Sequence, residues 1–420
     1  MAIESGSDTN GNGVLDSSEV TSTQYVCNAE SAVMCGSATS IAGPITISNA
    51  ADLAQLSNMQ CIDGDLIIAG TDLTSMPELA TLQTVTGSVS IAGNTALASL
   101  DDLASLVRVG LTYDVQGNPA LTDVSALAKL MRVEGIDIID NDALPDLSGF
   151  QTVTKLDADL VISGNHALTS LTGLDNLTSS SESIEIDSNR SLTSTSALDH
   201  LQSVAELDIS DNASLTDLSL ASLTRASVRL LIEQNAALVT ASLPQLSESS
   251  DGVVFSDDTA LTAVELPQML VTGHLTVTDG TVLQSIDAPL LAVASEDVTL
   301  ANLPALQSLS LPKLGEIGGS LLVQSVPLAS FGGFSALQSI GNELWIQGVV
   351  STDFAGLGML QAVAGNVVVT ANQNVTSFAG LTSLATIDGD LLVTNNPSLS
   401  QTVAQAFASS IAISGTITIN

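Results

Sequence analysis

A repeat of 22 to 24 residues runs through the chain and constrains its fold more than any other feature. Short stretches such as "SVSIAGN" at 88, "DLVISGN" at 159 and "NVVVTAN" at 366 alternate apolar and polar residues, which predicts strands. Seventeen copies begin at residues 44, 65, 88, 113, 135, 159, 183, 206, 229, 252, 274, 297, 320, 343, 366, 390 and 416. A period near 23 is too short for a helix pair and fits a solenoid with one strand per turn.

The central inward position of each strand predicts the register of the stack. It carries Ile91, Val115, Ile138, Ile162, Ile186, Ile209, Ile232, Phe255, Val277, Leu300, Val323, Ile346, Val369 and Val393. Aromatic residues make up only 2% of the chain, so we expect a core built from Leu, Ile, Val and Ala. Between strands, apolar residues lie three apart, which indicates loose or 3-10 turns packing back onto the sheet.

Three further positions repeat with the strands. An Asn ends the strand as Asn94, Asn118, Asn141, Asn165, Asn189, Asn212 and Asn235, and we expect these amides to form a structural ladder that satisfies backbone groups. Pro244, Pro267, Pro289 and Pro312 form a second series. Phe331, Phe354 and Phe378 are predicted to stack inside the solenoid.

The repeats, such as "GNPALTDVSALAKLMRVEG", resemble leucine-rich repeats, and more closely the L domains of receptors and of bacterial and fungal surface proteins. The resemblance covers roughly residues 33–420 and implies a right-handed solenoid of about 17 turns, with one long parallel sheet and 3-10 or irregular segments opposite. The stretch from "MCGSATS" to "CIDGDLII" resembles the opening of such a domain, which implies a disulfide between Cys35 and Cys61. Receptor L domains are much shorter and are flanked by Cys-rich modules, so receptor signalling is not carried over.

Composition limits the partners and the location. Eight basic against 45 acidic residues give a net charge of −37, which disfavours nucleic acid and anionic lipid. No apolar run is long enough to span a membrane. Cys27, Cys35 and Cys61 do not have zinc-site spacing, so a disulfide at the entry of the solenoid is the better interpretation, and a Cys27–Cys35 bridge stays open as an alternative. A disulfide favours an oxidising, extracellular compartment.

The stretch "DTNGNGVLDSSE" at residues 8–19 fills the ligand positions of an EF-hand loop. The predicted Ca²⁺ ligands are Asp8, Asn10, Asn12, Val14 through its carbonyl, Asp16 and Glu19, with Gly13 at the bend. The surrounding segment resembles a short acidic module of large secreted bacterial proteins. We therefore expect two parts, an acidic segment at 1–30 with a structural calcium loop and a solenoid at 31–420.

The sequence predicts no enzyme. His166, His200 and His274 fall at unrelated phases of the repeat, which indicates neither a catalytic triad nor a metal cluster. The few basic residues do not gather beside acids as a polysaccharide lyase would require. A polysaccharide-active enzyme and an ice-binding solenoid are kept as alternatives, although the outward threonines are few and interrupted.

The outward strand positions differ along the chain. Asp114, Asp137, Glu185, Asp187, Asp208 and Glu233 form an expected acidic stripe. Leu231, Val254, Leu322, Trp345, Val368 and Leu392 place apolar groups on the same face, and the last four form a predicted contact face, unless loops cover it. We expect a non-catalytic protein on a bacterial cell surface that binds a protein or glycan, or associates with itself. The final strand "TITIN" has no obvious polar cap, which also favours a covering partner or copy.

The calcium loop gives a first prediction. A chelator is expected to lower the thermal stability of the wild-type N-terminal segment and speed its proteolysis, because a Ca²⁺ ion bound only by the folded loop stabilises it. Asp8→Ala should remove this sensitivity. Wild-type melting and proteolysis that are unchanged by chelator would contradict calcium binding.

Overall fold

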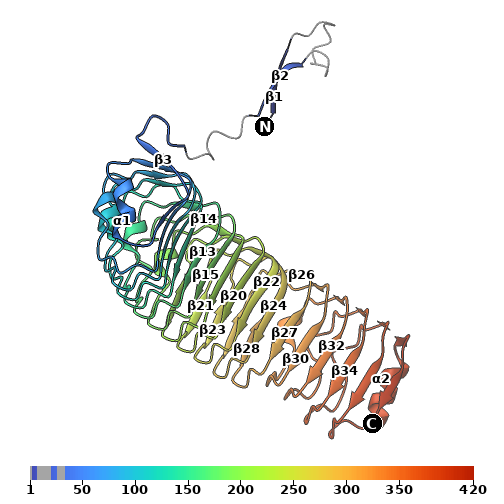
Figure 1. Ribbon diagram of the computed structural model, residues 1–420. Coiled ribbons are helices and arrows are strands. Elements are labelled where there is room, and N and C mark those ends of the chain that lie inside the picture. Colours follow the sequence, from blue (N-terminus) through green and yellow to red (C-terminus); the bar gives the residue numbers. More distant parts are fainter. Residues whose placement is uncertain (1, 7–19, 26–33) are drawn as a thin grey trace.

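A computed structural model describes residues 2–6, 20–25 and 34–420 of the chain. The body is a parallel β-solenoid of about 17 turns that stack from the N-terminal to the C-terminal end (Figure 1). The main sheet contains one strand per turn. Its strands are β4 (Ile45–Ile47), β6 (Leu66–Ala69), β8 (Val89–Ala92), β10 (Thr112–Gln116), β11 (Gly135–Ile139), β13 (Leu160–Ser163), β15 (Ser183–Asp187), β17 (Glu206–Ser210), β20 (Arg229–Glu233), β22 (Glu248–Ser256), β24 (Val271–Thr278), β27 (Val298–Ala301), β30 (Leu321–Gln324), β32 (Leu344–Gln347), β34 (Val367–Thr370), β36 (Leu391–Thr394) and β38 (Ile417–Ile419).

The predicted register is confirmed along the whole main sheet. Ile91 pairs with Val115, Val115 with Ile138, and the series continues in order to Val369 and Val393. All of these side chains are buried. Because each turn places its apolar residues directly on those of the next, the core is one continuous aliphatic column.

A second row of short parallel strands precedes the main strands. It comprises β3 (Ser40–Ala42), β5 (Cys61–Asp63), β7 (Thr84–Val85), β9 (Arg108–Val109), β12 (Lys155–Leu156), β14 (Ser179–Ser180), β16 (Ser203–Val204), β19 (Arg225–Ala226), β26 (Val293–Ala294), β29 (Glu316–Ile317), β31 (Ser339–Ile340), β33 (Ala362–Val363), β35 (Thr386–Ile387) and β37 (Ala412–Ile413). Strands β22 and β24 are long enough to take part in both rows. The two rows therefore become continuous at these two turns.

The remaining side of each turn is formed by 3-10 helices, irregular turns or short strands. The 3-10 helices are η1 (Ala54–Leu56), η2 (Pro77–Leu79), η3 (Asp101–Leu103), η4 (Ser125–Leu127), η5 (Ser148–Phe150), η6 (Ser196–Leu198) and η7 (Gly332–Phe334). A five-stranded parallel sheet replaces them between η6 and η7, with β18 (Asp217–Ser219), β21 (Thr240–Ser242), β23 (Ala263–Glu265), β25 (Ser285–Asp287) and β28 (Ser308–Ser310). This sheet was not predicted. Its segments bury every second residue, as in Ala241 and Leu243, rather than every third.

Both ends of the solenoid contain a helix. Helix α1 (Ala50–Leu53) is capped by Asn49, whose side chain accepts a hydrogen bond from the Ala51 N–H. Helix α2 (Gln401–Ser409) lies in the last turn and buries Phe407. The predicted stack of Phe331, Phe354 and Phe378 is confirmed, and Phe407 extends it, with ring centroids 3.9 to 5.7 Å apart. Helix α2 was not predicted.

The disulfide that the resemblance implied is present in the first turns. Cys35 and Cys61 are bonded, and their Cα atoms lie 5.5 Å apart. Cys27 lies outside the described residues. In the N-terminal segment, β1 (Ala2–Gly6) pairs antiparallel with β2 (Val20–Tyr25). The predicted calcium ligands from Asp8 to Glu19 lie between these strands in sequence and outside the described residues.

The Asn ladder is confirmed in hydrogen-bonding detail. In a typical rung, Asn165 donates from Nδ2 to the Ile138 carbonyl of the preceding turn at 2.7 Å. The Asn165 N–H donates to the Asn189 side-chain oxygen of the following turn at 3.0 Å. All seven predicted asparagines are fully buried. The ladder therefore supplies partners for backbone groups that the turn would otherwise bury without any.

Each rung follows a residue in the left-handed region, which bends the chain out of the main strand. The φ angles lie between 51° and 69°. The residues are Gly70, Gly93, Gly117, Asp140, Gly164, Ser188, Asp211, Gln234, Asp257, Asp279, Asn302, Ser325, Gly348, Ala371 and Asn395. Gly, Asn and Asp predominate at this position because they tolerate positive φ with the least strain.

Asp258 ends the ladder where an Asn would continue it. Its Oδ1 accepts the Asn235 N–H at 2.8 Å, while its buried Oδ2 has no hydrogen-bond partner. Burial raises the pKa of this carboxyl to about 7, with smaller contributions from Glu233 and Asp257. The ionised form of Asp258 is thus a weak point in an otherwise satisfied array.

A second prediction follows from this raised pKa. The folded state holds the Asp258 proton more tightly than the unfolded state, so protonation of Asp258 stabilises the fold. This contribution is complete below about pH 4 and is lost as the pH rises through about 7. Asp258→Asn should remove this loss, raising the free energy of unfolding at pH 8 by up to about 4 kcal/mol. Urea denaturation at pH 5 and pH 8 measures it. Asp257→Asn, at the exposed neighbouring position, is the control, and an equal effect there would contradict the assignment.

Candidate functional site

The outer face of the main sheet is a candidate contact surface, because its side chains stack in register as those of the core do. We call its central line the outer row. The outer row runs Thr46, Ile67, Ser90, Asp114, Asp137, Val161, Glu185, Asp208, Leu231, Val254, Thr276, Thr299, Leu322, Trp345, Val368, Leu392 and Thr418. The acidic residues of this row all lie between β10 and β17, with Val161 among them. An uninterrupted apolar run extends from Leu322 to Leu392, and Ile67, Leu231 and Val254 lie elsewhere in the row.

The acidic part extends from β10 to β20. Asp114 pairs with Asp137 and Glu185 pairs with Asp208, so carboxylates of successive turns face one another across the strand spacing. Asp187 and Glu233, which the sequence also placed in this stripe, lie two residues further along their strands. All six side chains are half-buried. The predicted acidic stripe is therefore present in the structure.

Burial, with repulsion between stacked carboxylates as the smaller cause, raises the pKa of several of these carboxyls. Burial, followed by repulsion from Asp114, Asp159 and Glu185, raises the pKa of Asp137 to about 6. Burial is also the main cause that raises the pKa of Glu185, of Asp208 and of Glu233. Basic residues offset this only locally, where Arg229 pairs with Glu206. The acidic stripe thus stores repulsion that a bound cation or cationic group would relieve.

The apolar part extends from β30 to β36 and contains the predicted contact residues. Leu322 pairs with Trp345, Trp345 with Val368, and Val368 with Leu392. Val368 is buried between its neighbours, and the other three side chains are half-buried. The indole N–H of Trp345 donates to Gln347 on the same strand at 3.0 Å. Four turns therefore present a continuous apolar strip with polar residues beside it.

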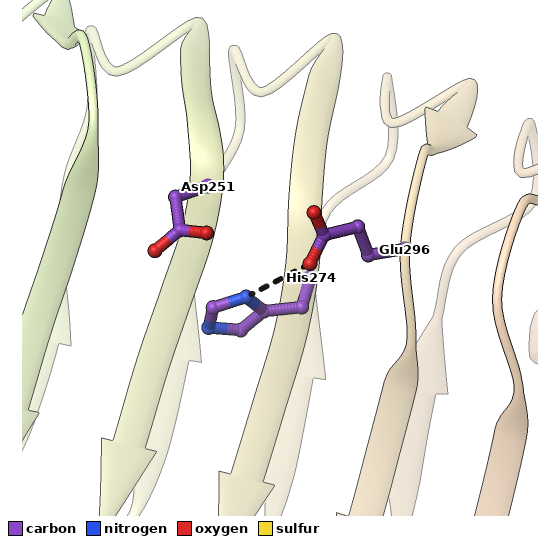
Figure 2. A group of neighbouring side chains, drawn as sticks. All are labelled: Asp251, His274 and Glu296. Atoms are coloured by element: carbon purple, nitrogen blue, oxygen red, sulfur yellow. Dashed lines mark ion pairs between the residues drawn. The ribbon is translucent and has the colours of Figure 1, made fainter.

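One histidine, His274, lies in a separate group of potential metal ligands that the sequence analysis did not predict. Asp251, His274 and Glu296 lie together, with potential ligand atoms all within 4.8 Å of one another (Figure 2). The sequence does contain a signal for this cluster, since residues 251, 274 and 296 are spaced by one repeat each, but the prediction did not use it. His166 instead pairs with Asp142, and Nδ1 of His200 lies 2.8 Å from the Asp175 carbonyl. The structure does not bring the three histidines together.

The comparison with protein families gives a match in the N-terminal segment. Residues 1–27 match the model of a domain of unknown function, DUF7151. No curated protein matches the chain. In the described part of the chain, neither helix has the length and apolar character needed to cross a bilayer. These findings leave the function of the solenoid to be argued from its own residues.

A third prediction concerns Asp137. Because its folded pKa is raised, its stabilising contribution is complete below about pH 4 and lost as the pH rises through about 6. Asp137→Asn should therefore raise the free energy of unfolding at pH 8 by about 1 kcal/mol after solvent screening, and the part of the gain that comes from repulsion by Asp114, Asp159 and Glu185 should shrink in high salt. Urea denaturation measures it. Asp72→Asn, at an exposed loop position after β6, should change little, and an equal gain there would contradict the assigned repulsion.

Proposed function

We propose that this chain is a non-catalytic binding or scaffolding protein that works outside the cell, on a bacterial surface. The leading support is the outer row, in which carboxylates gather from β10 to β17 and apolar side chains line up without interruption from β30 to β36. A long repetitive surface suits contact with a large partner, since each turn adds a similar contact rather than a pocket. The resemblance to leucine-rich repeats and L domains agrees with this role.

The extracellular location is supported by two features. The Cys35–Cys61 disulfide closes the first turns, and such bonds persist in oxidising compartments. The net charge of −37 suits a medium in which salt or divalent cations screen the repulsion. The calcium loop at Asp8–Glu19 belongs to the same proposal, with Ca²⁺ in a structural role.

We assign the apolar strip at Leu322, Trp345, Val368 and Leu392 to contact with a second copy of this chain. Two copies that meet through this strip bury apolar side chains against apolar side chains. The polar residues beside the strip, such as Gln324 and Gln347, supply a hydrogen-bonding rim. The acidic stripe lies several turns away, so it does not enter the contact directly. It opposes association through overall charge repulsion, which salt reduces.

A fourth prediction tests this contact. Self-association should increase as sodium chloride is raised from about 0.05 M to about 0.5 M, because screening weakens the repulsion between acidic copies while leaving apolar burial intact. Trp345→Glu should abolish it by placing a charge at the centre of the strip. Sedimentation velocity measures both effects.

The control is Thr46→Glu, which adds the same charge to the outer row at an exposed position in the first turn. This variant should associate as the wild type does. A wild-type chain that stays monomeric at every salt concentration, or equal association of Trp345→Glu, would contradict self-assembly through this strip.

A further inference from the structure

The cluster of Asp251, His274 and Glu296 lies where the two rows of strands become continuous. Strands β22 and β24 pair over both rows, but their register shifts between Ser249 and Gly252. Ser249 pairs with Thr272 and Gly252 pairs with His274, so β22 has one residue more than β24 in this interval. Such a bulge redirects a side chain and is common beside functional sites. Here the bulged interval of β22 consists of Ser250 and Asp251, opposite Gly273 of β24.

Three successive turns each contribute one side chain. Asp251 comes from β22, His274 from β24, and Glu296 from the segment just before β27 (Figure 2). The His274 Nδ1 and the Glu296 Oε2 lie 3.9 Å apart. The His274 side chain is 20% exposed, whereas that of Glu296 is 57% exposed, so the imidazole is the fixed member of the group.

Two glycines make room for this arrangement, Gly252 for the imidazole and Gly273 for the backbone of Asp251. A Cβ on Gly252 would lie 2.5 Å from two ring atoms of His274, and one on Gly273 would lie 2.0 Å from the Asp251 carbonyl oxygen. Gly252 also has a φ of 150°, which side-chain-bearing residues rarely adopt. The preceding turn carries Arg229 at the position of Gly252. The backbone is thus adapted locally to hold the ring next to Asp251.

We propose that Asp251, His274 and Glu296 bind a divalent transition metal ion of the zinc class. One imidazole nitrogen and two carboxylate oxygens are ligands that Zn²⁺ accepts, while an imidazole disfavours Ca²⁺, which takes oxygen ligands. Three protein ligands leave a further position for water. Bonds of about 2.0 to 2.2 Å require the ligand atoms to move closer than 4.8 Å, and the exposed carboxylates of Asp251 and Glu296 have the freedom to do so.

The site would act as a staple across three turns. Arg229, a basic residue near Asp251, forms an ion pair with Glu206 of the turn on its other side. The charge of Arg229 is therefore already neutralised. A metal that binds the stacked arrangement and not the unfolded chain raises stability by mass action. It would hold β22, β24 and the start of β27 in register where the bulge interrupts the pairing.

The test is titration of the full chain with zinc chloride in a buffer that contains excess Ca²⁺, so that the N-terminal loop does not compete. Calorimetry should show a zinc site in the wild type that is lost in His274→Ala. Glu296→Gln, a conservative change at an exposed position, should weaken binding by about tenfold or more, since even indirect support of a ligand contributes that much. His200→Ala is the matched control and should bind zinc normally.

Two further readouts separate a built site from general attraction to an acidic surface. Zinc should raise the melting temperature of the wild type and of His200→Ala, but not that of His274→Ala. Cobalt(II) should give visible ligand-field bands that disappear in His274→Ala. Zinc affinity that is equal in the wild type and in His274→Ala, or no zinc binding in the wild type, would overturn the proposal.

Discussion

In-register contact between equivalent residues one turn apart is the interaction on which the whole structure depends. Hydrophobic burial alone would tolerate a slip of the stack, because every turn presents aliphatic side chains of similar size. The buried asparagines remove this freedom. Asn165 donates hydrogen bonds to the Ile138 carbonyl and to the Asn189 side chain only when consecutive turns stack in the observed register. A slip would leave both groups buried without partners, which costs more than a lost aliphatic contact.

Most of this register could be predicted from the sequence. Inward residues from Ile91 to Val393 follow from simple alternation, and the Asn and Phe series follow from their spacing, because these positions obey one period. The five-stranded third sheet was missed because its alternating pattern contains only two apolar positions in a turn, such as Ala241 and Leu243. The cluster at His274 was missed because a bulge in β22 brings its members together, and the position of a bulge depends on backbone pairing rather than on composition.

The same register that stabilises the core also shapes the surface. Identical stacking brings carboxylates together at Asp114 and Asp137, where burial and the repulsion between them raise the pKa of Asp137, and brings apolar groups together at Trp345 and Val368. A globular fold would scatter such residues over several faces. In this solenoid, similar residues that recur once per repeat in the sequence form a stripe on the surface. The outer row can therefore carry separate contacts along its length. The Asp251–His274–Glu296 cluster also joins residues one repeat apart, but there the bulge in β22 brings Asp251 next to His274.

The central claim is the register itself, and engineered disulfides test it most directly. Thr276 and Thr299 are paired neighbours in the outer row, whereas Thr276 and Leu322 are separated by an intervening turn. Neighbouring strands lie about 4.8 Å apart, within disulfide range, and strands two apart lie beyond it. The account predicts that Thr276→Cys with Thr299→Cys forms an intramolecular disulfide on mild oxidation, as seen by peptide mapping, and that Thr276→Cys with Leu322→Cys does not. The opposite outcome, or equal cross-linking of both pairs, would contradict it.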